Sequence, residues 1–320
     1  MTDPKPIFLN ERGVFSLLKQ SKSGMSRALQ QRENVSGYLF LLPSLVFFLG
    51  FVVIPMIICI FTSFTDSNMH AKTATEFVAF SNYARLMQDE TFLRALRNTI
   101  VIVVASVPTV TAFSLWVASA IYKLKGVVRS AFRCIFYLPV VTGSVAVTVV
   151  WKWMYNNYYG VFNYVLKGAG LIEKNINWLG DERFALWCII LILFTTSVGQ
   201  PIVLYVSALG NVDNSLVEAA QVDGATKSQV FWKIKWAQMM PTTLYILVIT
   251  TINSFQCFAL IQLLTSGGSG TNTVMYYIYY TAFKLTEQHG HFGYANAMGV
   301  VLAIFIALLS AVQFRLAKEK

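Results

Sequence analysis

Six stretches of this chain, each about long enough to cross a lipid bilayer as a helix, contain no Lys, Arg, Asp or Glu. A spanning helix needs ~20 apolar residues, and a charge at the bilayer centre costs ~3 kcal/mol or more. Every charged side chain of the 320-residue chain lies outside these stretches. We therefore predict an all-α, polytopic membrane protein with six transmembrane helices. The predicted spans are residues 38–64, 98–122, 134–151, 184–209, 241–264 and 292–314.

The net charge of +10 does not indicate a nucleic-acid-binding protein, because the basic residues alternate between the two sides of the predicted membrane. The side that holds both termini carries 16 Lys and Arg residues and the other side 9, whereas the acidic residues divide as 7 and 8. Basic loops stay in the cytoplasm, so we predict that both termini are cytoplasmic. The basic segments are also expected to meet anionic lipid head groups.

The predicted layout is an N-terminal tail (1–37), one transmembrane domain (38–316) and a short C-terminal tail (317–320). The first tail is too long and too polar for a cleavable signal peptide. Val14, Phe15 and Leu18, interleaved with basic residues, are consistent with an interfacial helix, and a disordered tail is the alternative.

Enzyme and secondary-transporter functions lack support in the sequence. Motifs such as HExxH, GxSxG and the Walker A loop are absent, and the four cysteines are interpreted as small buried apolar residues. His289 and His291 are interpreted as solvated loop residues rather than metal ligands. Proton- or sodium-driven carriers usually bury ionisable residues in their spans, and the predicted spans have none. We predict no catalytic residue, no metal site and no cofactor in this chain.

The loops on the outer side carry weaker signals. Loop 152–183 is rich in Tyr, Asn and Trp, which we interpret as a membrane-interface belt, with substrate contact as the alternative. Loop 265–291 opens with the run Gly-Gly-Ser-Gly, which lacks a following Lys and is interpreted as a flexible turn. Prolines in the first four spans, among them Pro139 and Pro201, are expected to bend their helices.

The inner loop 211–240 is predicted to form two helices. Residues 215–218 fit a capping box, so the first helix is predicted to start at Ser215 and to end at Gly224 in a left-handed turn. A second helix is predicted from about Thr226 to Trp236. The loop has small, polar residues but no catalytic chemistry, which favours a docking element for a soluble partner. An interfacial linker between two spans is the alternative.

The same loop reads Glu-Ala-Ala-x-x-Asp-Gly-Ala over residues 218–225 and resembles the EAA loop of permeases of carbohydrate-uptake ABC importers, the maltose and glycerol-phosphate type. Ala237 stands where that family usually has proline, and Ser269 stands where it often has proline. The departure at Ala237 leaves open the angle at which the second loop helix exits. Residues 41–45 and 63–66 favour the first of the two permease types that pair in these importers. Further segments that resemble the family, in the same order along the chain, are 38–43, 77–83, 136–139, 151–156, 263–268 and 293–295.

This resemblance implies a type I importer permease that works by alternating access in the bacterial cytoplasmic membrane. The implied partners are a second permease, two cytoplasmic ATPases that bind ATP and Mg²⁺, an external solute-binding protein and a carbohydrate substrate. The residues implied to couple to the ATPases are Glu218, Ala219, Ala220, Asp223 and Gly224.

A path for an uncharged sugar needs hydrogen-bonding groups and an aromatic face without fixed charge. Asn253, Phe255 and Gln256 in the fifth span offer these groups, and the family resemblance favours this assignment. The break at Gly199-Gln200-Pro201 is the second part of the predicted path. The alternative is that Asn253 and Gln256 only bond neighbouring helices.

Overall fold

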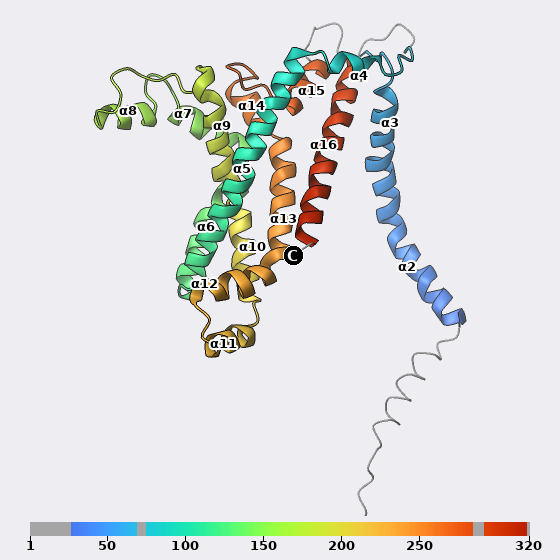
Figure 1. Cartoon of the computed structure of the whole chain (residues 1–320). Coiled ribbons are helices and arrows are strands. Elements are labelled where there is room, and N and C mark those ends of the chain that lie inside the picture. The colour runs from blue at the N-terminus through green and yellow to red at the C-terminus, as the bar shows by residue number, and fades with distance from the viewer. Residues whose placement is uncertain (1–26, 69–74, 284–290, 319–320) are drawn as a thin grey trace, which may run out of the picture. The chain divides into compact units, whose positions relative to one another are not determined.

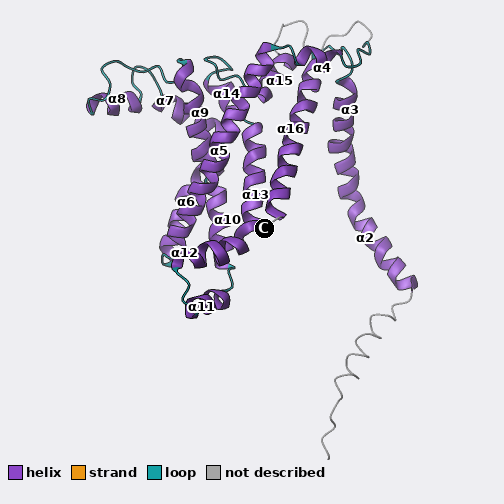
Figure 2. Cartoon of the chain, viewed as in Figure 1, coloured by secondary structure: helices purple, strands orange, loops and turns teal. Residues whose placement is uncertain are grey.

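The computed structural model describes residues 27–68, 75–283 and 291–318 (Figure 1). Within these ranges the regular elements are helices, joined by loops and two isolated β-bridges (Figure 2). Five described helices are long and apolar enough to cross a membrane, or six when one bent pair counts as a single span. The all-α, polytopic prediction is therefore confirmed. The proposed N-terminal interfacial helix, His70 and His289 lie outside the described residues.

The described elements are, in chain order, α2 (Arg27–Phe48), η1 (Leu49–Val53), α3 (Ile54–Thr62), α4 (Ser81–Leu86), α5 (Glu90–Tyr122), α6 (Gly126–Val141), α7 (Ser144–Met154), α8 (Val161–Gly168), α9 (Glu182–Ser197), α10 (Gly199–Gly210), α11 (Asn214–Val222), α12 (Lys227–Gln229), η2 (Val230–Lys235), α13 (Trp236–Phe255), α14 (Ala259–Leu264), α15 (Val274–Phe283) and α16 (Phe292–Lys318).

The first span consists of α2, the π-helical turn η1 and α3. Pro55 has no backbone N–H, and the helix widens just before it, where the Ile54 N–H donates to the Leu49 carbonyl five residues earlier. The π-turn η1 and α3 contain no buried residue. An apolar helix exposed on all sides is suited to a lipid environment.

The remaining spans pack around α5, which lies alongside α10 and α13 (Figure 1). Ile102, Val110 and Ala118 of α5 are fully buried, so the core follows this helix along its length. The short helices α11 and α12 lie at one end of this bundle, and α4, α14 and α15 lie at the other (Figure 1). The two ends therefore carry different structures at the expected membrane boundaries.

The third span, predicted at residues 134–151 with a bend at Pro139, is broken more sharply than one proline would cause. Helices α6 and α7 meet at an angle of 95° on either side of Thr142 and Gly143. Pro139 removes one helical hydrogen bond, and the β-branched run of Val140, Val141 and Thr142 followed by Gly143 has low helix propensity. Thr142 is extended, and its side chain donates to the Leu138 carbonyl at the end of α6.

The fifth span also differs from its predicted bounds, 241–264. Its helix starts at Lys227, passes through the π-helical turn η2 and breaks after Phe255, before the short helix α14. The predicted end of the second loop helix at Trp236 is therefore wrong. The loop helix continues through Ala237 into the span, and Pro241 lies within it without ending it. The predicted loop 265–291 contains a helix as well, α15, which the sequence analysis missed.

Candidate functional site

The helix that carries the EAA residues, α11, begins at Asn214, one residue before the predicted start. Asp213 is its N-cap, and its Oδ1 accepts hydrogen bonds from the Ser215 backbone N–H at 2.9 Å and from Ser215 Oγ at 2.7 Å. These bonds hold the pKa of the Asp213 carboxyl below its usual value. Ser215 therefore does not cap the helix as predicted, because the carboxylate is the stronger acceptor for the free N–H groups of the first turn.

The end of α11 follows the prediction. Gly224 has a φ of +79°, a left-handed conformation that costs glycine little. The Ala225 N–H donates to the Ala220 carbonyl at 2.9 Å, and the Gly224 N–H donates to the Gln221 carbonyl at 3.1 Å. These two bonds define a Schellman motif, which satisfies carbonyls that the helix end would leave free. A Cβ at Gly224 would meet no atom within 4 Å, so only the backbone conformation favours glycine here.

The outward side of α11 is small and partly apolar. Ala219 is exposed, and Leu216 and Val222, spaced three residues away on either side, are 50% and 87% exposed. Glu218 and Asp223 are exposed too, and within the described part of the chain their carboxylates have no ion pair or hydrogen-bond partner. We call Leu216, Glu218, Ala219, Val222 and Asp223 the α11 face. Exposed apolar side chains beside unpaired acids are typical of a surface that a partner covers. The sequence analysis missed Leu216 and Val222.

The loop is attached firmly to the fifth span. Thr226 and Gln229 form a reciprocal capping box, in which Gln229 Oε1 accepts from the Thr226 N–H at 2.8 Å and Thr226 Oγ1 accepts from the Gln229 N–H. The Asp213 N–H also donates to Gln238 Oε1 at 3.0 Å. The helix continues from α12 into α13, so these bonds connect both ends of α11 to the start of the fifth span.

Asn253 and Gln256 line one cavity of about 290 Å³ at the break of the fifth span. The break of the third span, with Thr142 and Ser144, and Thr196 of α9 line the same cavity. Both amide side chains are exposed in this chain and make no hydrogen bond to its described residues. The two breaks thus bring polar groups from three spans together beside apolar side chains.

The other predicted path residues lie apart from this cavity. Phe255 is buried in the core with Phe92 and Met298. A Cβ at Gly199 would lie within 2.4 Å of the Phe136 carbonyl oxygen, so glycine permits close packing of α10 on α6. Gln200 lines a different cavity, of about 530 Å³, beside α6. The structure therefore groups Asn253 with Gln256 and does not group them with the other three residues.

A carboxylate at the end of the bundle opposite α11 joins three helices (Figure 1). Asp89 caps α5 through Oδ1, and its Oδ2 accepts hydrogen bonds from Tyr277 Oη at 2.8 Å and Tyr294 Oη at 2.7 Å. Burial by itself would raise the pKa of Asp89, but the bonds from the two tyrosines and from two backbone N–H groups lower it overall. Only the cap, an acid before a helix, has a local sequence signal, because the tyrosines are 188 and 205 residues away.

The cysteines and potential metal ligands form no clear site. No group of three His, Cys, Asp or Glu side chains in the described ranges is placed to hold a metal ion. Cys134, Cys188 and Cys257 form no disulfide with the described residues. Cys188 and Cys257 are buried as predicted, whereas Cys59 and Cys134 are exposed on the surface of this chain, which corrects the interpretation of all four as buried. Both lie in predicted spans, where lipid or another subunit covers an exposed side chain.

The bundle of apolar helices, the polar intramembrane cavity and the exposed α11 face together define a membrane-embedded transport subunit. Residues 83–319 match the family described as binding-protein-dependent transport system inner membrane component, and the chain belongs to this family of permeases. It is therefore an integral membrane protein.

Individual relatives agree with this family. The chain is 32% identical to the probable ABC transporter permease protein YesP of Bacillus subtilis, over 91% of this chain and 92% of the relative. It is 30% identical to the lactose transport system permease protein LacF of Rhizobium radiobacter, over 92% and 97% respectively. A chain in a crystal structure of a bacterial alginate ABC transporter has 24% identity and a TM-score of 0.77, and the match covers 90% of this chain and 96% of that one. The resemblance to importer permeases and the expected fold are confirmed.

Proposed function

We propose that this chain is one permease subunit of a carbohydrate importer and forms half of the translocation path. The names of several relatives support the substrate class: a lactose permease, a multiple sugar-binding transport permease from Streptococcus mutans and a diacetylchitobiose uptake permease from Streptomyces coelicolor. A second permease completes the path. An external solute-binding protein delivers the sugar, and two ATPase subunits bind ATP and Mg²⁺ and carry out hydrolysis, so this chain is a transport subunit and not an enzyme.

The exposed α11 face is the observation that carries the coupling part of the proposal. Its apolar and small residues fit a groove on an ATPase, and Glu218 is free to pair with a basic residue there. Ala220 and Gly224 set the end of the helix and so the direction in which the face points. Closure of the ATPase dimer would move α11, and the continuous helix from Lys227 would pass that movement to the fifth span.

The cavity at Asn253 and Gln256 is the proposed contact with the sugar. An unpaired amide within a membrane span is costly unless it faces a polar partner or water. The two amides have no such partner in the described part of this chain, which argues against the alternative that they only bond neighbouring helices of the same subunit. Phe258, rather than Phe255, supplies an aromatic side chain at this cavity.

The test is sugar uptake and sugar-stimulated ATP hydrolysis by the complete transporter reconstituted in lipid vesicles. A cysteine introduced at Ala219 should form a disulfide with a cysteine in the ATPase groove, without loss of assembly. A cysteine at Asn211, at the end of α10, is the control and should form no such disulfide. If Ala219→Cys cannot be crosslinked to the ATPase in any nucleotide state, the α11 face is not the docking surface. Uptake of an amino acid or a metal ion in place of a sugar would contradict the substrate class.

A further inference from the structure

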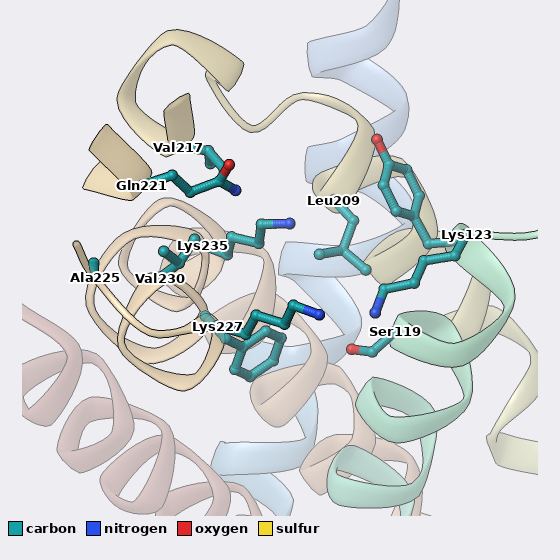
Figure 3. A pocket seen from close by; sticks show the side chains of 11 residues that line it. Ser119, Lys123, Leu209, Val217, Gln221, Ala225, Lys227, Val230 and Lys235 are labelled. Carbon is teal, nitrogen blue, oxygen red and sulfur yellow. The ribbon is translucent and has the colours of Figure 1, made fainter. Parts of the chain in front are cut away.

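A third cavity lies between the EAA loop (residues 211–240), here called the coupling loop, and the adjoining ends of α5 and α10 (Figure 3). Its volume is about 600 Å³, twice that of the cavity at Asn253. Lys123, Lys227 and Lys235 line it, and we call it the basic cavity. Neither the transport path nor the α11 face uses these three lysines.

The three ammonium groups come from two parts of the chain and point into the same space (Figure 3). Lys123 follows α5, whereas Lys227 and Lys235 belong to the helix that leads into the fifth span. No carboxylate of the described residues lines the cavity. The ion pairs within the described ranges are Arg94–Glu90 and Arg183–Asp181, so these lysines have no counter-charge in that part of the chain. Three like charges around one space repel one another, and the attraction of an anion bound between them would offset that repulsion.

Neutral hydrogen-bonding groups accompany the lysines. Ser119 Oγ lines the cavity, is shielded from solvent and has no hydrogen-bond partner in the described structure. Gln221 directs its amide toward the same space (Figure 3). A phosphate group has enough oxygens to accept from three ammonium groups, a hydroxyl and an amide, whereas a carboxylate has only two oxygens.

Apolar side chains form the rest of the wall, among them Leu209, Val230 and Phe231. Leu209 lies at the end of one spanning helix and Phe231 near the start of another, so the cavity is at the membrane boundary. Lysines beside apolar side chains at this depth match the phosphate and glycerol of an anionic lipid.

We propose that the basic cavity binds a phosphate group at the membrane surface, and so holds the coupling loop against the span ends. An anionic lipid and a soluble phosphate both present this chemistry. The proposal does not depend on the identity of the transported solute, because Asn253 and Gln256 lie in a separate cavity.

The experiment measures binding to the purified complete transporter in nanodiscs. One arm compares phosphatidylglycerol with phosphatidylcholine by native mass spectrometry of retained lipid, and the other adds inorganic phosphate to phosphatidylcholine discs and follows thermal stability. Retained phosphatidylglycerol identifies the lipid as the source, and a stability shift with phosphate alone identifies a soluble ligand. Absence of both effects overturns the proposal.

Variants assign the binding to this cavity. Each basic residue near a membrane contributes ~1 kcal/mol to anionic-lipid binding, so each Lys→Gln change should weaken binding roughly fivefold and the triple change on the order of 100-fold. Lys→Arg changes at the same three positions should retain binding, which separates lost charge from lost folding. Lys233→Gln is the matched control, because Lys233 lies on the same helix, is exposed and does not line the cavity. Equal loss in the Lys233→Gln variant would show only general attraction to a basic surface and would overturn the proposal.

Discussion

At the scale of single residues, Gly224 determines where α11 ends and therefore the direction in which the α11 face points. A valine at its φ of +79° would carry strain on the order of 1–3 kcal/mol, although the space around it is open. We expect Gly224→Val to insert and assemble but to lose most sugar-stimulated ATP hydrolysis, measured in proteoliposomes. Gly170→Val is the matched control, since Gly170 has a φ of +69° and open space in another loop. Normal stimulation in Gly224→Val, or equal loss in Gly170→Val, would contradict the coupling role.

Asp89 is a second residue whose effect can be measured, because it joins α5 to α15 and α16. Asp89→Asn should lower stability by roughly 2 kcal/mol, since the two tyrosine hydroxyls lose a charged acceptor. The pKa of Asp89 is lower in the folded protein, so its stabilising contribution is present above the unfolded pKa of about 3.9. That contribution is lost as the pH falls through the lower, folded pKa.

The measurement is the thermal unfolding of wild type, Asp89→Asn and the control variant Asp181→Asn in detergent between pH 3 and 7. Asp181 also caps a helix, and its pKa is lowered to about 2 by hydrogen bonds from Arg183, but the side chain of Arg183 is 79% exposed. Removing the Asp181 carboxylate should therefore lower stability by less than removing that of Asp89. The difference between wild type and Asp89→Asn should be widest at neutral pH and should narrow below about pH 4. A difference that stays constant with pH would exclude the charged carboxylate as its cause.

At the scale of the helices, the breaks in the third and fifth spans create the cavity at Asn253 and Gln256. The sequence predicted a bend at Pro139 but not the full 95° turn, which depends on Thr142 and Gly143 adopting extended conformations together. The sequence paired the two amides of the fifth span, and their role in the path stays a prediction. Their separation from Phe255 was not predicted, because helical spacing alone cannot show that the helix ends at that residue.

The cavity at Asn253 and Gln256, which the two breaks form together, leads to a prediction about sugar uptake. Asn253→Ala and Gln256→Ala should each lower sugar uptake about tenfold or change which sugar is taken up, because a buried polar contact contributes on the order of 1–2 kcal/mol to binding. Assembly with the partner subunits should remain intact. Gln200→Ala is the control, since Gln200 lines the separate cavity beside α6. If Gln200→Ala alone lowers uptake, the path follows that second cavity instead. Failure of the Asn253→Ala and Gln256→Ala complexes to assemble would favour the packing alternative.

At the scale of the whole molecule, the sequence predicted the features that depend on the membrane and missed those that depend on contacts. Charge-free stretches identified the spanning segments because excluding charge from lipid is a local requirement of each segment. Tyr277 and Tyr294, by contrast, meet Asp89 only through folding, and no local pattern marks such a pairing. The Schellman end of α11 lies between these cases, since Gly224 signals it locally and the structure supplies its two hydrogen bonds.

The orientation of the molecule is a prediction that concerns every span at once. With 16 basic residues on the side of the termini and 9 on the other, we expect Gly224 and both termini in the cytoplasm and Asn157 outside. Reporter fusions of alkaline phosphatase and green fluorescent protein at these two positions measure this directly. Phosphatase should be active at Asn157 and inactive at Gly224, and fluorescence should show the opposite pattern. An odd number of true spans between two reporters places them on opposite sides of the membrane. Asn157 follows α7 and Gly224 follows α10, with the single span Glu182–Gly210 between them. If both positions report the same side, that span does not cross the membrane. If both report the reverse of this pattern, the α11 face cannot meet a cytoplasmic ATPase.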